Sequence, residues 1–233
     1  MDSVDSDFNK RKDEVNEYFS FLEKLNNDNI KLNYTKENDT EEFVISTKLQ
    51  RIFIANTFLL LYNLVESTIR NSIVTIYNKI KDDEVIYDNL SEKIKQIWLH
   101  KNGKRFSIYS SDNTIEVNLQ NIINDIINNE IIMLTKEDIH ISGNIDAQEI
   151  RNLADKIGFE VSSNGRYLVD IKEKRNRLAH GEHTFHDIGK DFTYNDLNTY
   201  KETTFIHLED VISKIKNFID DEKYKIQQNI GSQ

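Results

Sequence analysis

The strongest pattern in the chain is a helical repeat of apolar residues that runs from about Ser46 to about Ile80. Apolar side chains return every three to four residues and cover a wide face of the expected helix. A helix that is apolar over so much of its circumference is typically central, so we expect it in the core of a helical fold. The apolar residues of this segment are Leu49, Ile52, Phe53, Phe58, Leu59, Leu60, Tyr62, Leu64, Val65, Ile69, Ile73, Ile76 and Tyr77.

Helical spacing recurs along most of the remaining chain, whereas alternating strand patterns are few. Gly158 and Gly181 are placed to end two of the helices, and Thr193 with Asp196 resembles a capping box that starts the last one. The absence of proline permits long helices. We therefore predict an all-α fold, a helical bundle. Besides the central helix, the expected helices are about 7–25, one capped by Ser91, 119–132, 146–157, 167–180 and 193–225.

Polar segments connect these helices. We expect loops at 26–42 and 101–113 and a short extended piece at 139–143. The stretch from Gly143 to Asp146 resembles a helix entry, with Asn144 or Asp146 as the N-cap. Alternatively, Asn144 contributes to a substrate cleft. No linker rich in Gly, Pro or Ser divides the chain and no repeat is visible, so residues 1–233 are expected to form a single domain with helix 7–25 packed on it.

Composition excludes several classes of protein. There is no cysteine, so disulfides and thiolate zinc sites are excluded. A formal net charge of −10 argues against a protein that coats nucleic acid non-specifically, although it allows a local basic site. The polar start of the chain does not resemble a signal peptide, and the apolar stretch from Ile52 to Val65 is interrupted by Asn56 and Asn63. We therefore expect a cytoplasmic protein with no membrane partner.

The basic segment from Lys172 to Gly181 is the most informative part of the sequence. It holds four positive charges and one negative charge, and it ends an expected helix directly before a glycine. Taken alone, it could be a basic last turn that complements the helix dipole. Arg175 and His180 are five residues apart, so they are turned by about 140° and do not share a narrow stripe. Two copies of such a helix across a two-fold axis could bring both residues into one cleft.

Histidine and arginine suit the cleavage of RNA, which carries its own nucleophile in the 2′-hydroxyl. Histidine titrates near neutrality and can transfer protons, and arginine presents a planar fork to phosphate oxygens. We therefore expect His180 to act as general acid or base and Arg175 to stabilise the phosphate. The product would carry a 2′,3′-cyclic phosphate, and no metal or cofactor would be needed.

The same residues resemble a known family. Arg175, Asn176 and His180 resemble the R-x4-H motif of the HEPN superfamily, which includes many metal-independent ribonucleases. The resemblance implies a HEPN-type helical bundle that dimerises through its motif helices, with frequent roles in phage defence or toxin–antitoxin systems. Further stretches over about 45–225 resemble the MAE-type (RiboL-PSP-like) bacterial branch: Leu61–Thr68, Ser142–Ala147, and Leu178–Gly181 followed by Phe185 and Gly189.

Glu66 is the second candidate for the site, because it is the only acidic residue between Glu42 and Asp82. A carboxylate near an apolar core must be paired. Arg70, four residues later on the same helix, is the ordinary partner. Arg175 or Arg177 is the partner that would make Glu66 orient the catalytic arginine or line the cleft.

Other polar residues around the motif have two readings each. Lys172, Lys174 and Arg177 could bind the RNA backbone or form a solvated charged face, and Asn176 could contact the ligand or only accompany the site.

His180, His183, His186 and Asp187 could suggest a metal cluster, but Gly181 ends the helix and prevents them from sharing one face. Glu182 stands where some HEPN toxins carry a modifiable tyrosine, so regulation by that route is not expected.

These observations favour a dimeric endoribonuclease that acts as a toxin or antiviral effector, with RNA as substrate and an antitoxin or defence protein as partner. The alternative is a catalytically inactive HEPN module that binds RNA, a nucleotide or a protein. A third hypothesis is a purely structural helical domain.

Overall fold

The computed structural model describes residues 1–26, 30–36, 39–103, 112–138, 143–162 and 165–227. Helices make up most of these residues, and a single two-stranded sheet accompanies them. The prediction of an all-α fold is therefore confirmed.

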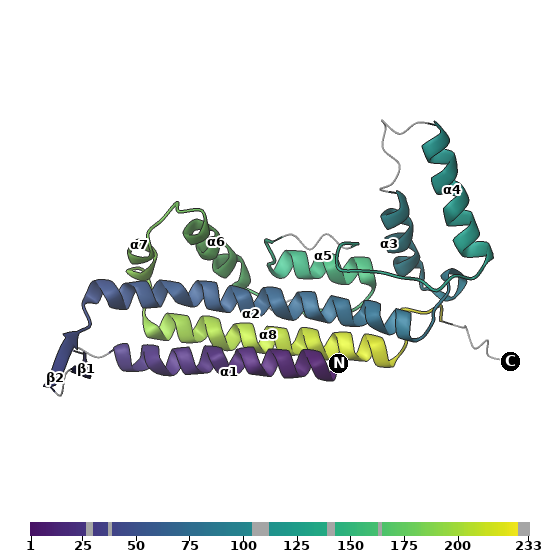
Figure 1. Ribbon diagram of the computed structural model, residues 1–233. Coiled ribbons are helices and arrows are strands. Elements are labelled where there is room, and N and C mark those ends of the chain that lie inside the picture. The colour runs from purple at the N-terminus through teal and green to yellow at the C-terminus, as the bar shows by residue number, and fades with distance from the viewer. Residues whose placement is uncertain (27–29, 37–38, 104–111, 139–142, 163–164, 228–233) are drawn as a thin grey trace.

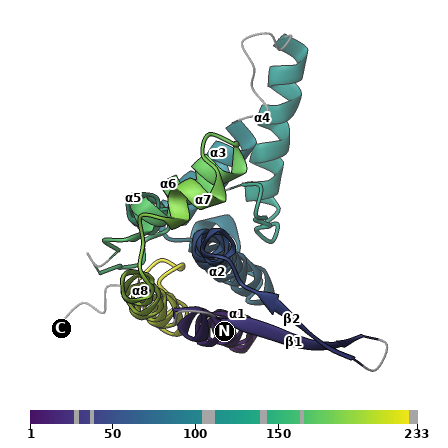
Figure 2. The ribbon, with the colours of Figure 1, turned by 90° about the vertical axis from the view of Figure 1, so that its left-hand side faces the viewer.

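Three long helices form the body of the protein: α1 (Asp2–Leu25), α2 (Thr47–Asp82) and α8 (Tyr194–Asp220). They lie side by side, with α1 antiparallel to the other two (Figures 1 and 2). α2 is the central helix, as predicted, because it packs against α1, α6, α7 and α8. Its N-terminus is capped by Ser46, whose side chain accepts the Leu49 N–H at 3.2 Å.

Three shorter helices lie in a row along α2, on the side away from α1 (Figure 1): α5 (Ala147–Ile157), α6 (Leu168–Ala179) and α7 (Phe185–Gly189). At the C-terminal end of α2, a 3-10 turn (Tyr87–Asn89) leads to α3 (Glu92–Gly103). The next helix, α4 (Asp112–Ile127), projects away from the body (Figures 1 and 2).

The predicted loop at 26–42 is wrong over most of its length. Strands β1 (Lys31–Lys36) and β2 (Asp39–Val44) form an antiparallel hairpin in which Lys31 pairs with Val44 and Lys36 with Asp39. Every residue of both strands is exposed. Only β1 shows alternation, with Leu32 and Tyr34 between polar residues, and neither strand buries a face in the protein, so the strand pattern of this segment is weak.

Several boundaries also differ from the prediction. α1 begins at residue 2 rather than about 7, because Val4 is already buried in the core. α4 spans 112–127 rather than 119–132, α8 ends at 220 rather than 225, and α3 extends to 103 inside a predicted loop. Ser91 precedes α3, but its buried hydroxyl has no hydrogen-bond partner in the part of the chain that the structure describes, so it is not the predicted cap. Most of the extended piece expected at 139–143 lies outside the described residues.

α2 (Thr47–Asp82) is both long and apolar. By length and composition alone it could cross a membrane, although 50% of its most apolar window is buried inside the protein. The core helix of a soluble protein meets the same criteria. Asn56 and Asn63, which interrupt the apolar stretch from Ile52 to Val65, do not keep α2 below these criteria.

The contact between α7 and α2 depends on Gly189. A Cβ atom added at this position would lie 1.9 Å from the carbonyl oxygen of Arg51, so the two backbones approach closer than any side chain allows. Gly189 thus lets the five-residue helix α7 lie directly on α2. This contact holds the part of the chain that follows α6.

We expect Gly189→Ala to destabilise the protein by about 1–3 kcal/mol, the usual cost of overpacking. The melting temperature should fall by roughly 2–4 °C for each kcal/mol in a chain of this size. The matched control is Gly103→Ala, since an added Cβ at Gly103 meets no atom within 4 Å. Equal melting temperatures for Gly189→Ala and the control would contradict the close approach.

Candidate functional site

The basic motif lies on α6, as predicted, and its last turn is closed by Gly181. This glycine has a φ of +70°, a left-handed conformation that glycine adopts readily. The N–H of Gly181 donates to the Leu178 carbonyl at 3.2 Å, and the N–H of Glu182 donates to the Arg177 carbonyl at 2.9 Å. These bonds satisfy carbonyl groups at the helix end, so α6 stops with His180 as its C-cap.

Arg175 is held from three directions. Its Nη2 lies 3.4 Å from Glu66 Oε2, and its Nη1 donates to Asn176 Oδ1 at 2.7 Å. The guanidinium carbon lies 3.9 Å from the centre of the Tyr62 ring. Only 23% of the Arg175 side chain is exposed. The guanidinium is therefore fixed between α2 and the surface of α6 instead of moving freely in solvent.

Glu66 pairs with both kinds of partner that the sequence left open. Arg70 lies 2.8 Å from Oε1, and Arg175 lies 3.4 Å from Oε2. The Glu66 side chain is 24% exposed, so its charge is mostly withdrawn from water and is compensated by two guanidinium groups. The shared carboxylate links the motif helix to the central helix.

Tyr62 supplies a contact that the sequence reading missed. Its hydroxyl donates to the Gly143 carbonyl at 2.6 Å and accepts the Ile145 N–H at 3.0 Å. Burial raises the pKa of Tyr62 above its ordinary value, so the hydroxyl stays protonated and can donate at neutral pH. The periodicity of α2 indicated only that Tyr62 is buried. In the sequence, its position one turn before Glu66 was the one indication that Tyr62 belongs to the site.

The segment before α5 lies beside the motif helix. Asn176 Nδ2 donates to Asn144 Oδ1 at 2.8 Å, so these two predicted site residues are in contact. Asp146 is the N-cap of α5, because its side chain accepts the N–H groups of Gln148 and Glu149. Of the two N-cap candidates, Asp146 is therefore the cap, and Asn144 faces the motif.

The three other basic residues of the motif differ in their surroundings. Lys172 Nζ lies 2.5 Å from Asp146 Oδ2, so its charge is matched inside the protein. Lys174 Nζ lies 5.7 Å from the centre of the Phe192 ring, which is a cation–π contact. Arg177 is half-buried, and its backbone carbonyl takes part in the helix ending.

His180 stands apart from this cluster. Its side chain is exposed at the end of α6. Over the described residues, no hydrogen bond or ion pair joins it to Arg175 or to any other side chain. The structure therefore brings together Glu66, Asn144, Arg175 and Asn176, whereas Lys172 pairs with Asp146 and His180 faces outward.

The histidines after the motif do not converge. Arg51 Nη1 lies 2.9 Å from His186 Nε2, and a guanidinium can only donate, so this ring nitrogen accepts. His183 is exposed. Within the part of the chain that the structure describes, no three His, Asp or Glu residues are grouped so that they could hold a metal ion.

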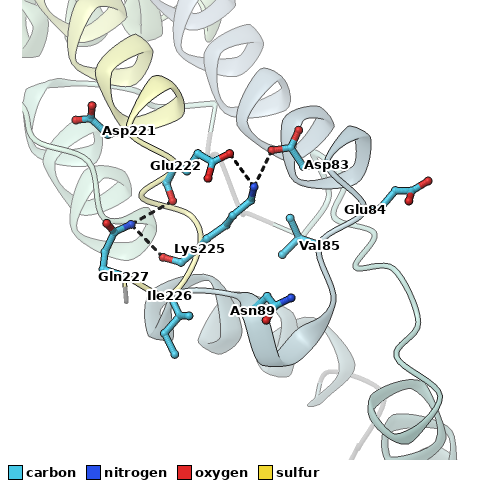
Figure 3. A pocket seen from close by; sticks show the side chains of 9 residues that line it. All are labelled: Asp83, Glu84, Val85, Asn89, Asp221, Glu222, Lys225, Ile226 and Gln227. Atoms are coloured by element: carbon cyan, nitrogen blue, oxygen red, sulfur yellow. Dashed lines mark hydrogen bonds and ion pairs between the residues drawn. The ribbon is translucent and has the colours of Figure 1, made fainter. Parts of the chain in front are cut away.

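A polar cavity of about 450 Å³ lies at the far end of the body, where α2 and α8 end (Figure 3). Lys225 bridges Asp83 at 3.2 Å and Glu222 at 2.8 Å. Burial alone raises the pKa of Asp83, but hydrogen bonds from Lys79, Tyr224 and Lys225 outweigh it and hold the pKa at about 2. Asp83, the C-cap of α2, is seventeen positions after Glu66, which corresponds to about 25 Å along the helix. The cavity therefore lies outside the candidate site.

Comparison with protein families identifies the chain. A family model described as HEPN_MAE_28990-like HEPN matches residues 1–224, which is almost the whole length. The chain belongs to this HEPN family. The match includes α1, which lies before the region of 45–225 where the motifs resemble the family.

Comparisons of this HEPN protein with curated proteins and with solved structures gave no match. Membership of the family points to an RNase-like protein or to a module that binds RNA or nucleotides.

The ion pair between Asp146 and Lys172 should make the stability of this HEPN protein depend on pH. Burial raises the pKa of Asp146, but the hydrogen bonds from Lys172 and from the Glu149 and Gln148 backbone outweigh it, so the pKa lies below its ordinary value. The ionised carboxylate therefore stabilises the fold above the unfolded pKa of about 3.9, and this contribution is lost as the pH falls through the lower folded value.

Asp146→Asn keeps an acceptor for the α5 cap but removes the charge. We expect it to lower the free energy of unfolding by about 1.5 kcal/mol near neutral pH, the size of a partly buried charged hydrogen bond. Urea unfolding from neutral pH down to below the Asp pKa measures the difference, which should vanish at the acidic end. A difference that is constant with pH would contradict the role of the charge.

Proposed function

We propose that this HEPN protein is a metal-independent endoribonuclease. The observation that supports it most is the fixed guanidinium of Arg175. An arginine has five N–H donors, and the contacts to Glu66 and Asn176 engage two of them. The remaining donors are available for the oxygens of a phosphate, whose negative charge grows as the transition state forms.

In the proposed reaction, the 2′-oxygen of the RNA forms a bond to phosphorus while the bond from phosphorus to the 5′-oxygen breaks. One proton leaves the 2′-hydroxyl and one is delivered to the departing 5′-oxygen. The products are an RNA end with a 2′,3′-cyclic phosphate and an end with a 5′-hydroxyl. His180 transfers protons in this scheme, because imidazole can accept and donate near neutral pH.

A composite site in a homodimer would fit the exposed position of His180. Arg175 and His180 point to different sides of α6, so one protomer alone makes a poor cleft. Two copies of the end of α6 would provide two imidazoles, one to accept and one to donate a proton. Asn176, Asn144 and Arg177 would line the shared cleft, and Lys174 would contact the RNA backbone.

We further propose that the protein acts in the cytoplasm as a phage-defence or toxin–antitoxin effector, with an antitoxin or defence protein as partner. The alternative is an inactive HEPN module that binds RNA, a nucleotide or a protein. The outward position of His180, without contact to Arg175 among the described residues, favours this alternative if no dimer forms.

We expect purified protein to cleave RNA in excess EDTA and His180→Ala to lower the rate about 100- to 10,000-fold, the range for loss of general acid–base catalysis. Gel analysis of a labelled RNA gives the rate, and phosphatase sensitivity before and after acid treatment identifies the cyclic phosphate. The control is His183→Ala, which removes a nearby exposed imidazole and should leave the rate unchanged. Cleavage by His180→Ala at the wild-type rate would contradict the proposal.

A further inference from the structure

We propose that Tyr62 is a positioning residue, which orients the Arg175 guanidinium toward the scissile phosphate. The inference rests on the proposed function and adds to it a residue that lies under the site rather than in it. Tyr62 is 3% exposed, so it acts through Arg175 and does not touch the RNA.

The ring of Tyr62 and the carboxylate of Glu66 restrain Arg175 in different ways. Glu66 and the side chain of Asn176 bond to its N–H groups, which restrains rotation of the guanidinium in its own plane. The Tyr62 ring lies beneath the guanidinium carbon, with its centre 3.9 Å away, and so limits how far the guanidinium can move toward α2. With both restraints, the direction of the remaining N–H donors is defined before substrate binds.

Tyr62 itself is fixed by the two hydrogen bonds of its hydroxyl to the backbone of Gly143 and Ile145. The residue between them, Asn144, is the one that contacts Asn176. A single side chain on α2 therefore joins the central helix to the motif helix and to the segment that precedes α5. Because the charge-stabilising group is preorganised in this way, the benefit should appear in the chemical step.

The test compares two variants at this position. Tyr62→Leu removes the ring, and we expect kcat to fall at least tenfold while KM changes less than about threefold. Tyr62→Phe keeps the ring and loses only the hydroxyl, so it should retain at least a third of kcat. The midpoints of the pH–rate profile should stay those of wild type in both, because His180 is untouched.

Tyr77 provides the matched control. It lies on the same helix and is 1% exposed, and its hydroxyl has no hydrogen-bond partner among the described residues. Tyr77→Leu should create a comparable cavity far from the motif and lower the melting temperature, but leave kcat within twofold of wild type at a temperature where it is folded. A kcat loss in Tyr77→Leu equal to that in Tyr62→Leu would show that the loss comes from destabilisation of the fold, and it would overturn the proposal.

A spectroscopic readout separates this inference from the proposed function. Because the Arg175 guanidinium carbon lies over the Tyr62 ring, the Nε–H proton bonded to that group should show a ring-current shift in NMR spectra, which is kept in Tyr62→Phe and lost in Tyr62→Leu. Unchanged kcat in folded Tyr62→Leu, or a loss confined to KM, would overturn the positioning role alone. Full cleavage by His180→Ala would overturn the proposed function, and the positioning role with it, whatever the NMR signal shows.

Discussion

A mostly buried carboxylate on the central helix determines how the site is built. Glu66 is 24% exposed and lies on a helix whose surroundings are largely apolar, so its charge requires cationic partners. Arg70 on the same helix compensates one oxygen and Arg175 on α6 the other. Removal of one partner from such a pair is costly because it leaves a charge without compensation. Because the Glu66 carboxylate needs a cationic partner, its ion pair with Arg175 attaches α6 to the central helix and orients this arginine.

The rest of the site follows from that attachment. Tyr62 lies beneath the guanidinium, and its hydroxyl holds the backbone that carries Asn144. Asp146 caps α5 and pairs with Lys172, which fastens α6 a second time. Beyond Gly181, the chain returns to α2 through α7 and the close contact at Gly189. The result is a fixed arginine on α6 and an exposed histidine at the end of the same helix, and the proposed composite site would join two such helix ends.

Much of this could be predicted from local patterns. The central helix, the helix ends at Gly158 and Gly181, and the capping box of Thr193 and Asp196 all depend on residues close in sequence, and the structure contains each of them. The pairing requirement of Glu66 was also visible, because an isolated acid in an apolar helix is conspicuous. Its pairing with Arg175 in addition to Arg70 was not visible, since that contact depends on how two helices pack.

The missed features have physical reasons. Strand β1 alternates Leu32 and Tyr34 with polar residues, a signal that the prediction of a loop overlooked, whereas β2 shows no alternation and neither strand buries a face. The role of Tyr62 depends on contacts with residues more than eighty positions away, and periodicity reports only that the residue is buried. Ser91 occupies a cap position but points into the core, where its hydroxyl has no partner.

The central claim is that Glu66 acts on the chemistry through Arg175, and a double-mutant cycle of cleavage rates tests it most directly. Single-turnover cleavage would be measured for wild type, Glu66→Gln, Arg175→Ala and the double variant, with folding of each confirmed by thermal unfolding. The account predicts that Glu66→Gln slows cleavage in the wild-type background and has no further effect once Arg175 is absent. An equal slowing by Glu66→Gln in both backgrounds would show that the two residues act independently and would contradict the account.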